Sequence, residues 1–150
     1  MRGRALMMKS FILSFILFAF SSALKAELEG YYEKIKGPLV CPSGAIQLKT
    51  FKKERILLFG SSHSWSLGEK DRGETKEVVD DGCTYETVYE KKADSFSAKT
   101  ERSRCSDVSF NGAVTELIKQ SEMKLIYQYE FLSANKKKTN YSCEYLKKKE

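Results

Sequence analysis

The C-terminal stretch of the chain decides the fold. Residues 123–147 read MKLIYQYEFLSANKKKTNYSCEYLK. Two runs, 123–132 and 140–147, alternate apolar and polar residues, and a polar turn separates them. Because successive side chains of a strand point to opposite faces, the alternation predicts an antiparallel hairpin with one buried and one solvated face. The expected buried face carries Leu125, Tyr127, Tyr129, Phe131, Tyr141, Cys143 and Tyr145.

A turn around residues 135–138 sets the register of this hairpin. It pairs Tyr127 with Tyr145, Tyr129 with Cys143 and Phe131 with Tyr141. Aromatic pairs across neighbouring strands stabilise a sheet by up to about 1 kcal/mol each. The expected interior lining is therefore Tyr127, Tyr129, Phe131, Tyr141 and Tyr145.

The same alternation, rich in aromatic and β-branched residues, continues through the rest of the chain. It predicts strands at 29–36, 44–51, 55–60, 74–79, 83–91, 95–103, 113–119, 123–132 and 140–147. The spacing of Val114, Leu117 and Ile118 also permits a short helix over 112–121. The pattern predicts an all-β domain, a single antiparallel barrel of about eight strands. A two-sheet sandwich is the alternative.

The chain has four cysteines, and their positions suggest two disulfides. Cys83 and Cys105 are equidistant from a turn at 93–95, so they are expected to face each other across adjacent strands. Cys41 then pairs with Cys143 and ties an early segment to the last strand. Four cysteines allow three pairings, and spacing alone does not exclude the other two. Tying the first and last strands together favours barrel closure, which removes exposed sheet edges.

The first 26 residues have the order of a secretory signal peptide. Basic Arg2, Arg4 and Lys9 precede an apolar run over 11–20 and the small residues 21–23. The run is about half the length of a membrane-spanning helix, so no stable membrane anchor is expected. Cleavage after Ala26, or alternatively after Ala23, leaves a single domain over 27–150. We therefore expect a secreted or periplasmic protein, where disulfides persist.

Removal of the leader changes the charge. The full chain carries +6, but four of its 26 basic residues lie in the leader, which leaves 22 basic against 20 acidic residues and a charge of +2. Basic and acidic residues mostly alternate, so the chain lacks the concentrated basic face of a nucleic-acid-binding protein. No nucleic-acid partner is expected.

Residues 28–32 read Leu-Glu-Gly-Tyr-Tyr. This segment resembles the Gly-x-aromatic start of the first strand in lipocalin-like barrels, with Tyr32 where that family usually has Trp. The resemblance covers these five residues. It implies a barrel with an apolar interior that holds a small ligand.

No catalytic, cofactor or metal site is expected. His63, the one histidine, could act as a base on a neighbouring serine with Asp80 or Asp81 as its orienting group. Adjacent side chains in an extended loop point apart, however, so we expect an ordinary exposed histidine. The cysteines lack the short spacing of zinc sites. No pair of acids stands out for hydrolysis, because most are expected on solvated strand faces: Glu86, Glu90, Glu101, Glu116, Glu130 and Glu144.

The stretch 60–73 is the best candidate for a recognition loop. It is rich in serine and glycine and contains His63, Trp65 and Leu67, the latter two as exposed anchors or, alternatively, folded back onto the barrel end. We expect a non-enzymatic binding protein, with two modes open. One is recognition of a macromolecule, for example as a hydrolase inhibitor; the other is carriage of a small apolar ligand inside the barrel. Bulky inner side chains leave little room in a small barrel, which favours surface recognition.

Overall fold

The computed structural model describes residues 27–79 and 82–149. The predicted signal peptide, residues 1–26, lies outside the described residues, as do Asp80 and Asp81. A short 3₁₀ turn, η1 (Val108–Phe110), precedes the eighth strand. The strands are β1 (Gly30–Lys36), β2 (Gly44–Phe51), β3 (Glu54–Phe59), β4 (His63–Leu67), β5 (Arg72–Val78), β6 (Thr84–Lys91), β7 (Ser95–Ser103), β8 (Gly112–Ser121), β9 (Lys124–Ser133) and β10 (Lys138–Lys147).

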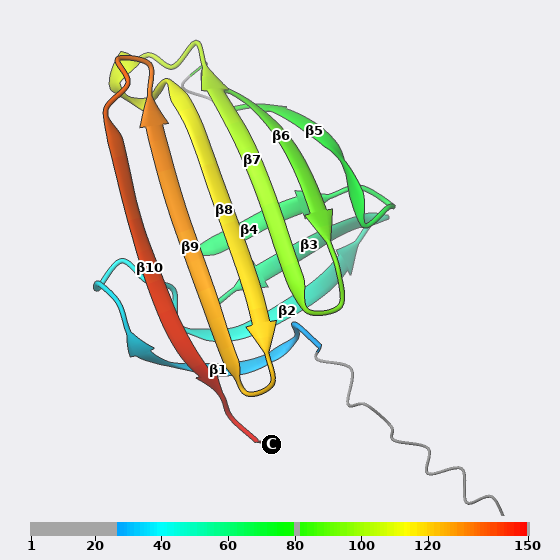
Figure 1. Cartoon of the computed structure of the whole chain (residues 1–150). Helices are drawn as coiled ribbons and strands as arrows, with labels where there is room; N and C mark the ends of the chain where they lie inside the picture. Colours follow the sequence, from blue (N-terminus) through cyan, green and yellow to red (C-terminus); the bar gives the residue numbers. More distant parts are fainter. Residues whose placement is uncertain (1–26, 80–81, 150) are drawn as a thin grey trace, which may run out of the picture.

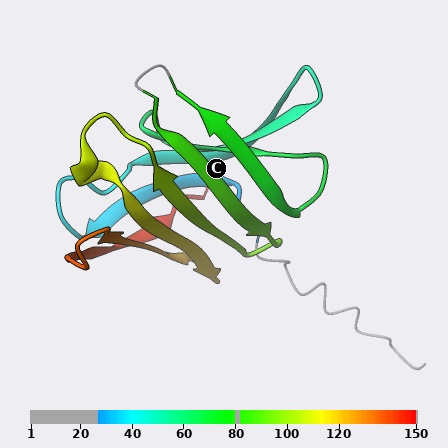
Figure 2. The same cartoon turned by 90° about the horizontal axis from the view of Figure 1, so that it is seen from above.

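The strands form one antiparallel sheet that curls into a nearly closed barrel (Figure 1). Their order is β4-β3-β2-β1-β10-β9-β8-β7-β6-β5. In Figure 1 the strands β1–β4 cross behind β5–β10, and the view from above in Figure 2 shows the sheet curving around an interior. The predicted small antiparallel barrel is thus confirmed, with ten strands in place of about eight. One continuous sheet also replaces the alternative sandwich.

The register of the C-terminal hairpin differs from the predicted one by two residues. Tyr145 pairs with Leu125, Cys143 with Tyr127 and Tyr141 with Tyr129. The chain reverses earlier than expected because Lys136 adopts a positive φ of 65°, so that Lys138 already pairs with Leu132. An even shift leaves every side chain on its predicted face.

Residues 112–121 form β8 and not a helix. Hydrogen-bonded partners on both sides, β7 and β9, fix this segment as a central strand. Central pairing outweighs the local spacing of Leu117 and Ile118, because a helix here would leave the backbone groups of both neighbouring strands unpaired.

Both predicted disulfides are present. Cys41 is bonded to Cys143, and Cys83 to Cys105. The β6–β7 register pairs Thr84 with Ser103, one residue away from the symmetric register expected from the two cysteines. Arg104, with a φ of 60°, takes up the extra residue before Cys105.

The interior is packed with aromatic and aliphatic side chains. Phe59 lies at its centre, with ring centroids 5.2 Å from Tyr145, 6.2 Å from Tyr127 and 6.5 Å from Tyr32. Aromatic pairs in these tilted and edge-to-face arrangements add about 0.5–1.5 kcal/mol each beyond simple burial. These contacts join the N-terminal strands β1 and β3 to the C-terminal strands β9 and β10 in one core.

Consecutive strands β4 and β5 lie at the two ends of the sheet order, so the barrel has a seam between them. Side chains fasten this seam. The Tyr89 hydroxyl accepts a hydrogen bond from Gly68 N–H at 2.5 Å, and Arg55 Nη2 lies 2.6 Å from Asp71 Oδ1. Tyr89 fits here because Gly73 has no side chain; a Cβ at that position would lie 2.8 Å from the hydroxyl. The seam is therefore held together without strand pairing.

Candidate functional site

A cavity of about 390 Å³ lies inside the barrel beside the β4–β5 seam. Its lining residues come mainly from strands β4 to β9 and are largely polar. They are Ser62, His63, Ser64, Trp65, Ser66, Thr75, Glu77, Val79, Tyr85, Thr87, Thr100, Arg102, Glu116 and Tyr129. Ser64, Ser66 and Glu77 are exposed, so the cavity opens to solvent at the seam. Its volume falls in the range of small-molecule sites.

A buried carboxylate, Glu116, stands in the cavity wall on β8. Trp65 Nε1 donates a hydrogen bond to its Oε2, and the Tyr127 hydroxyl donates to its Oε1, both at 2.7 Å. Among the described residues no basic side chain forms an ion pair with Glu116. Two neutral donors therefore stabilise this carboxylate. Through these hydrogen bonds Glu116 of β8 is linked to Trp65 of β4 and to Tyr127 of β9.

Glu116 is an exception to the expectation that most of the six acids lie on solvated strand faces. In β8 it lies on the same face as Val114 and Ile118, both fully buried. In a strand, residues 114, 116 and 118 share one face, so the apolar Val114 and Ile118 indicate that Glu116 is buried with them. This indication was obscured because the same stretch also has helical spacing. In a helix Glu116 would lie on the side away from Val114 and Ile118.

His63 lies half-buried at the start of β4. Its ring centroid is 5.6 Å from that of Tyr127, and its Nδ1 lies 3.0 Å from Ser62 Oγ. The expectation of an ordinary exposed histidine is therefore wrong, since the ring is half-buried in the cavity wall. Ser62 reaches the ring because a turn precedes β4 and the chain is not extended at Ser62. Glu116 has both oxygens engaged by Trp65 and Tyr127, and within the described chain it forms no hydrogen bond with His63.

Burial lowers the pKa of His63 below its usual 6.5, and the negative charge of Glu116 offsets this only in part. The imidazole is therefore neutral at pH 7. In the unfolded chain the ring takes up its proton near pH 6.5, whereas the folded protein does so only at lower pH.

We expect acid to destabilise the protein through His63. The free energy of unfolding falls as the pH drops below about 6.5, because the unfolded state binds the proton first, and it stops falling below the lowered pKa of the folded state. Urea unfolding of the wild type and of His63→Gln at about pH 7.5 and 5.5 measures the effect. The variant should lose less stability than the wild type, and equal losses would contradict this assignment.

Tyrosines around the cavity are held in their protonated form. Burial raises the pKa of Tyr127, and the neighbouring Glu116 charge raises it further. Burial also raises the pKa of Tyr129 and of Tyr141, whose rings stack with centroids 4.8 Å apart. These side chains can therefore act only as neutral hydroxyls over the physiological pH range.

The expectation that Trp65 and Leu67 of the stretch 60–73 are exposed anchors is wrong, and the alternative, that both fold back onto the barrel, is what the structure shows. Residues 63–67 form β4, and the side chains of Trp65 and Leu67 are 7% and 2% exposed. Alternation placed both on the inner face once β4 paired with β3, so they fold back onto the barrel interior. They belong to the core, where Trp65 packs 5.0 Å from Phe96. Only His63 and Trp65 of the three line the cavity.

The five residues expected to line the interior lie on one face of β9 and β10. Tyr127 and Tyr145 are fully buried, while Tyr129, Phe131 and Tyr141 are half-buried. Only Tyr129 lines the cavity. The hairpin thus supplies mainly the packed part of the interior. The cavity is bounded chiefly by β4 to β8, which the sequence did not indicate as the lining of a ligand site.

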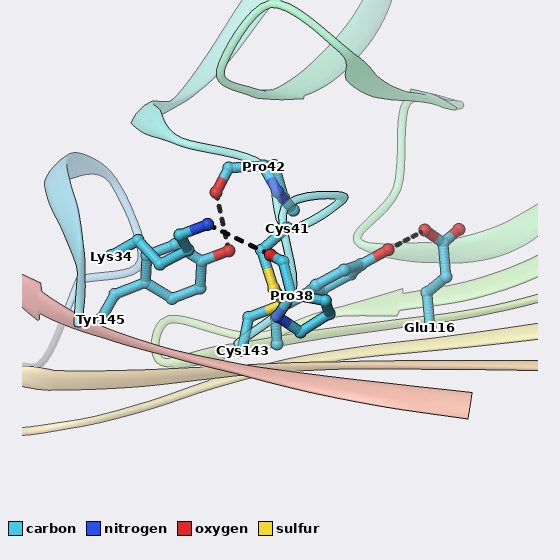
Figure 3. Close-up of a disulfide and its surroundings, with 8 residues drawn as sticks. Lys34, Pro38, Cys41, Pro42, Glu116, Cys143 and Tyr145 are labelled. Atoms are coloured by element: carbon cyan, nitrogen blue, oxygen red, sulfur yellow. Dashed lines mark hydrogen bonds between the residues drawn. A yellow bond between two sulfur atoms is a disulfide. The ribbon is translucent and has the colours of Figure 1, made fainter. Parts of the chain in front are cut away.

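A turn beside the Cys41–Cys143 disulfide is the second feature; Figure 3 shows the disulfide and the hydrogen bonds around it. The Cys41 N–H donates to the Pro38 carbonyl at 3.1 Å and closes a turn whose tip is Leu39 and Val40. Lys34 Nζ donates to the same carbonyl at 3.1 Å, and the Tyr145 hydroxyl donates to Pro42 O at 2.7 Å. Leu39 is 98% exposed, so a fixed turn presents an apolar tip to solvent.

Residues 27–79 and 82–149 contain no group of three or more His, Cys, Asp or Glu side chains placed to hold a metal ion. No helix in these ranges is long and apolar enough to cross a membrane.

Comparison with known proteins gives no further assignment. No family model, no curated protein and no solved structure matches this chain.

Proposed function

We propose that this protein is a secreted or periplasmic, non-enzymatic binding protein that carries a small amphipathic ligand inside its barrel. The observation that supports this most is the solvent-connected cavity of about 390 Å³ beside the seam. The aromatic side chains of Trp65, Tyr85 and Tyr129 give the cavity apolar surface for the ligand to pack against. The hydroxyl and charged groups of the lining can orient the ligand through hydrogen bonds. The two disulfides are compatible with an oxidising compartment.

The cavity changes the balance between the two binding modes. Sequence alone favoured surface recognition because bulky inner residues were expected to fill the barrel. Those residues fill one part of the interior, and a separate part, on the side of β4 and β5, stays open. The lipocalin-like carrier suggested by residues 28–32 becomes the better-supported proposal, with a more polar cavity than that resemblance implied.

A cavity-filling variant tests the carrier proposal. Thr75 lies on β5 in the cavity wall, and Thr75→Phe should abolish binding of N-phenylnaphthylamine, an uncharged amphiphilic dye, while the protein stays folded. Energy transfer from Trp65, which lines the cavity, reports binding. Glu74→Phe, on the opposite face of the same strand, is the matched control and should bind as the wild type does. Equal binding by both variants, or none by the wild type, would contradict the proposal.

The Leu39–Val40 turn supports a second candidate function, recognition of a macromolecule such as a hydrolase. An apolar tip held by a disulfide loses little conformational entropy on binding. A photo-crosslinking residue at position 39 should then capture one discrete protein from the native compartment, and one at exposed Phe51 should not. The same capture pattern at both positions would remove this candidate.

A further inference from the structure

Arg102 stands out among the cavity residues because no carboxylate of the described residues forms an ion pair with it. It projects inward from β7, and its guanidinium carbon lies 5.5 Å from the Tyr85 ring centroid and 6.0 Å from that of Phe131. Within the described chain no acceptor forms a hydrogen bond with it and no carboxylate forms an ion pair with it. Its Nε is fully buried and unpaired.

Arg55 provides the contrast inside the same molecule. It is also a half-buried arginine with a buried, unpaired Nε. The chain satisfies its terminal nitrogens, however: Nη2 lies 2.6 Å from Asp71 Oδ1, and Nη1 donates to the Glu69 carbonyl. A guanidinium offers five donors, and leaving them without acceptors in a partly buried site is costly. The two aromatic rings beside Arg102, of Tyr85 and Phe131, attract its positive charge but accept none of these hydrogen bonds in the way that a carboxylate does.

The surroundings of Arg102 suit a single negative charge. Tyr129 lies close enough for the Arg102 charge to affect its pKa, and its neutral hydroxyl is a second donor on the same wall. Glu77 and Glu116 also line the cavity. Their charges repel every anion, and the repulsion grows with the charge of the ligand, so among anions a group with one negative charge is disfavoured least. A carboxylate, or two of the three oxygens of a sulfonate, can accept two parallel hydrogen bonds from the guanidinium.

We propose that Arg102 binds the carboxylate or sulfonate group of a monoanionic amphiphile whose apolar body lies in the cavity against Trp65. The assignment rests on the carrier function proposed above and names the chemical class of its ligand. Tyr85 and Phe131 act by packing beside the guanidinium, which limits its movement and keeps it at the cavity wall.

Two dyes that share one ring system test the assignment. Anilinonaphthalene sulfonate carries one negative charge, and N-phenylnaphthylamine is its uncharged counterpart. We expect Arg102→Gln to weaken the sulfonate dye about tenfold or more, since a charge-assisted hydrogen bond is lost. Binding of the uncharged dye should change less than about twofold, because it makes no such bond. Arg72→Gln, which removes an exposed arginine from β5, is the matched control and should alter neither affinity.

The outcomes separate the two proposals. If the wild type binds neither dye, the carrier function fails. If it binds both and Arg102→Gln leaves the sulfonate affinity unchanged, or weakens both dyes equally, the role of Arg102 fails while the carrier function stands. Arg102→Lys guards against misfolding of the first variant: it keeps the charge but loses the flat fork, and should weaken the sulfonate dye by an intermediate factor.

Discussion

Replacing both Cys41 and Cys143 with alanine is expected to lower the free energy of unfolding by about 4–5 kcal/mol. The bond joins residues 102 positions apart, so its loss frees a loop that spans most of the domain. It also holds the segment before β2 against β10, the strand that pairs with β1. Guanidinium unfolding of the purified oxidised protein and of the double variant measures the difference.

The second disulfide provides the matched control. Cys83 and Cys105 are 22 positions apart, and the same loop-entropy argument gives a loss of about 3 kcal/mol for their double replacement. Cys41 and Cys143 should therefore contribute more. If the Cys83–Cys105 variant were the less stable of the two, stabilisation would not follow loop length, and local packing at β6 and β7 would be the stronger effect.

Replacing Glu116 with alanine is expected to lower the free energy of unfolding by about 3 kcal/mol. The reason is that two buried donors, Trp65 Nε1 and the Tyr127 hydroxyl, would lose their shared acceptor. Each orphaned donor costs about 1–3 kcal/mol. The change should also alter Trp65 emission, since the charge beside its indole nitrogen disappears. Glu74→Ala, at an exposed position, should change stability by less than about 0.5 kcal/mol.

A double-mutant cycle tests whether the Glu116 effect arises from these contacts. Tyr127→Phe removes one donor and keeps the ring, so combining it with Glu116→Ala should cost less than the sum of the single losses. The coupling should be about 1 kcal/mol or more. Strict additivity would show that Tyr127 and Glu116 act independently, contrary to their hydrogen bond of 2.7 Å.

Local pattern predicted the strands well because period-two alternation depends only on which side chains are apolar. It located nine of the ten strands and the two faces of the C-terminal hairpin, and cysteine symmetry gave both disulfides. It missed β4, where Ser64 and Ser66 alternate with Trp65 and Leu67 in a stretch that also has the composition of a loop. Short polar residues suit both a surface loop and the exposed side of a seam strand, so composition alone misassigned it.

The candidate site could not be predicted in the same way. Glu116 and Arg102 are polar, and polar residues are assigned to solvent unless the facing strand is known. Only the curling of the sheet brings Trp65 of β4 against Glu116 of β8, 51 residues apart in sequence. A hydrogen bond at that separation leaves no mark in the local pattern of either strand.

The sequence by itself determined that the chain forms antiparallel strands and which side chains share a face, and it favoured the cysteine pairing that the structure shows. These properties follow from the geometry of single strands and turns. Tertiary structure alone decided the position of the seam between β4 and β5, the contact of Glu116 with Trp65, and the open cavity with Arg102 in its wall, where no carboxylate of the described residues pairs with it. These features depend on how the ten strands close around one interior, because the burial of an inner side chain is set by the side chains that face it from the opposite strands of the barrel.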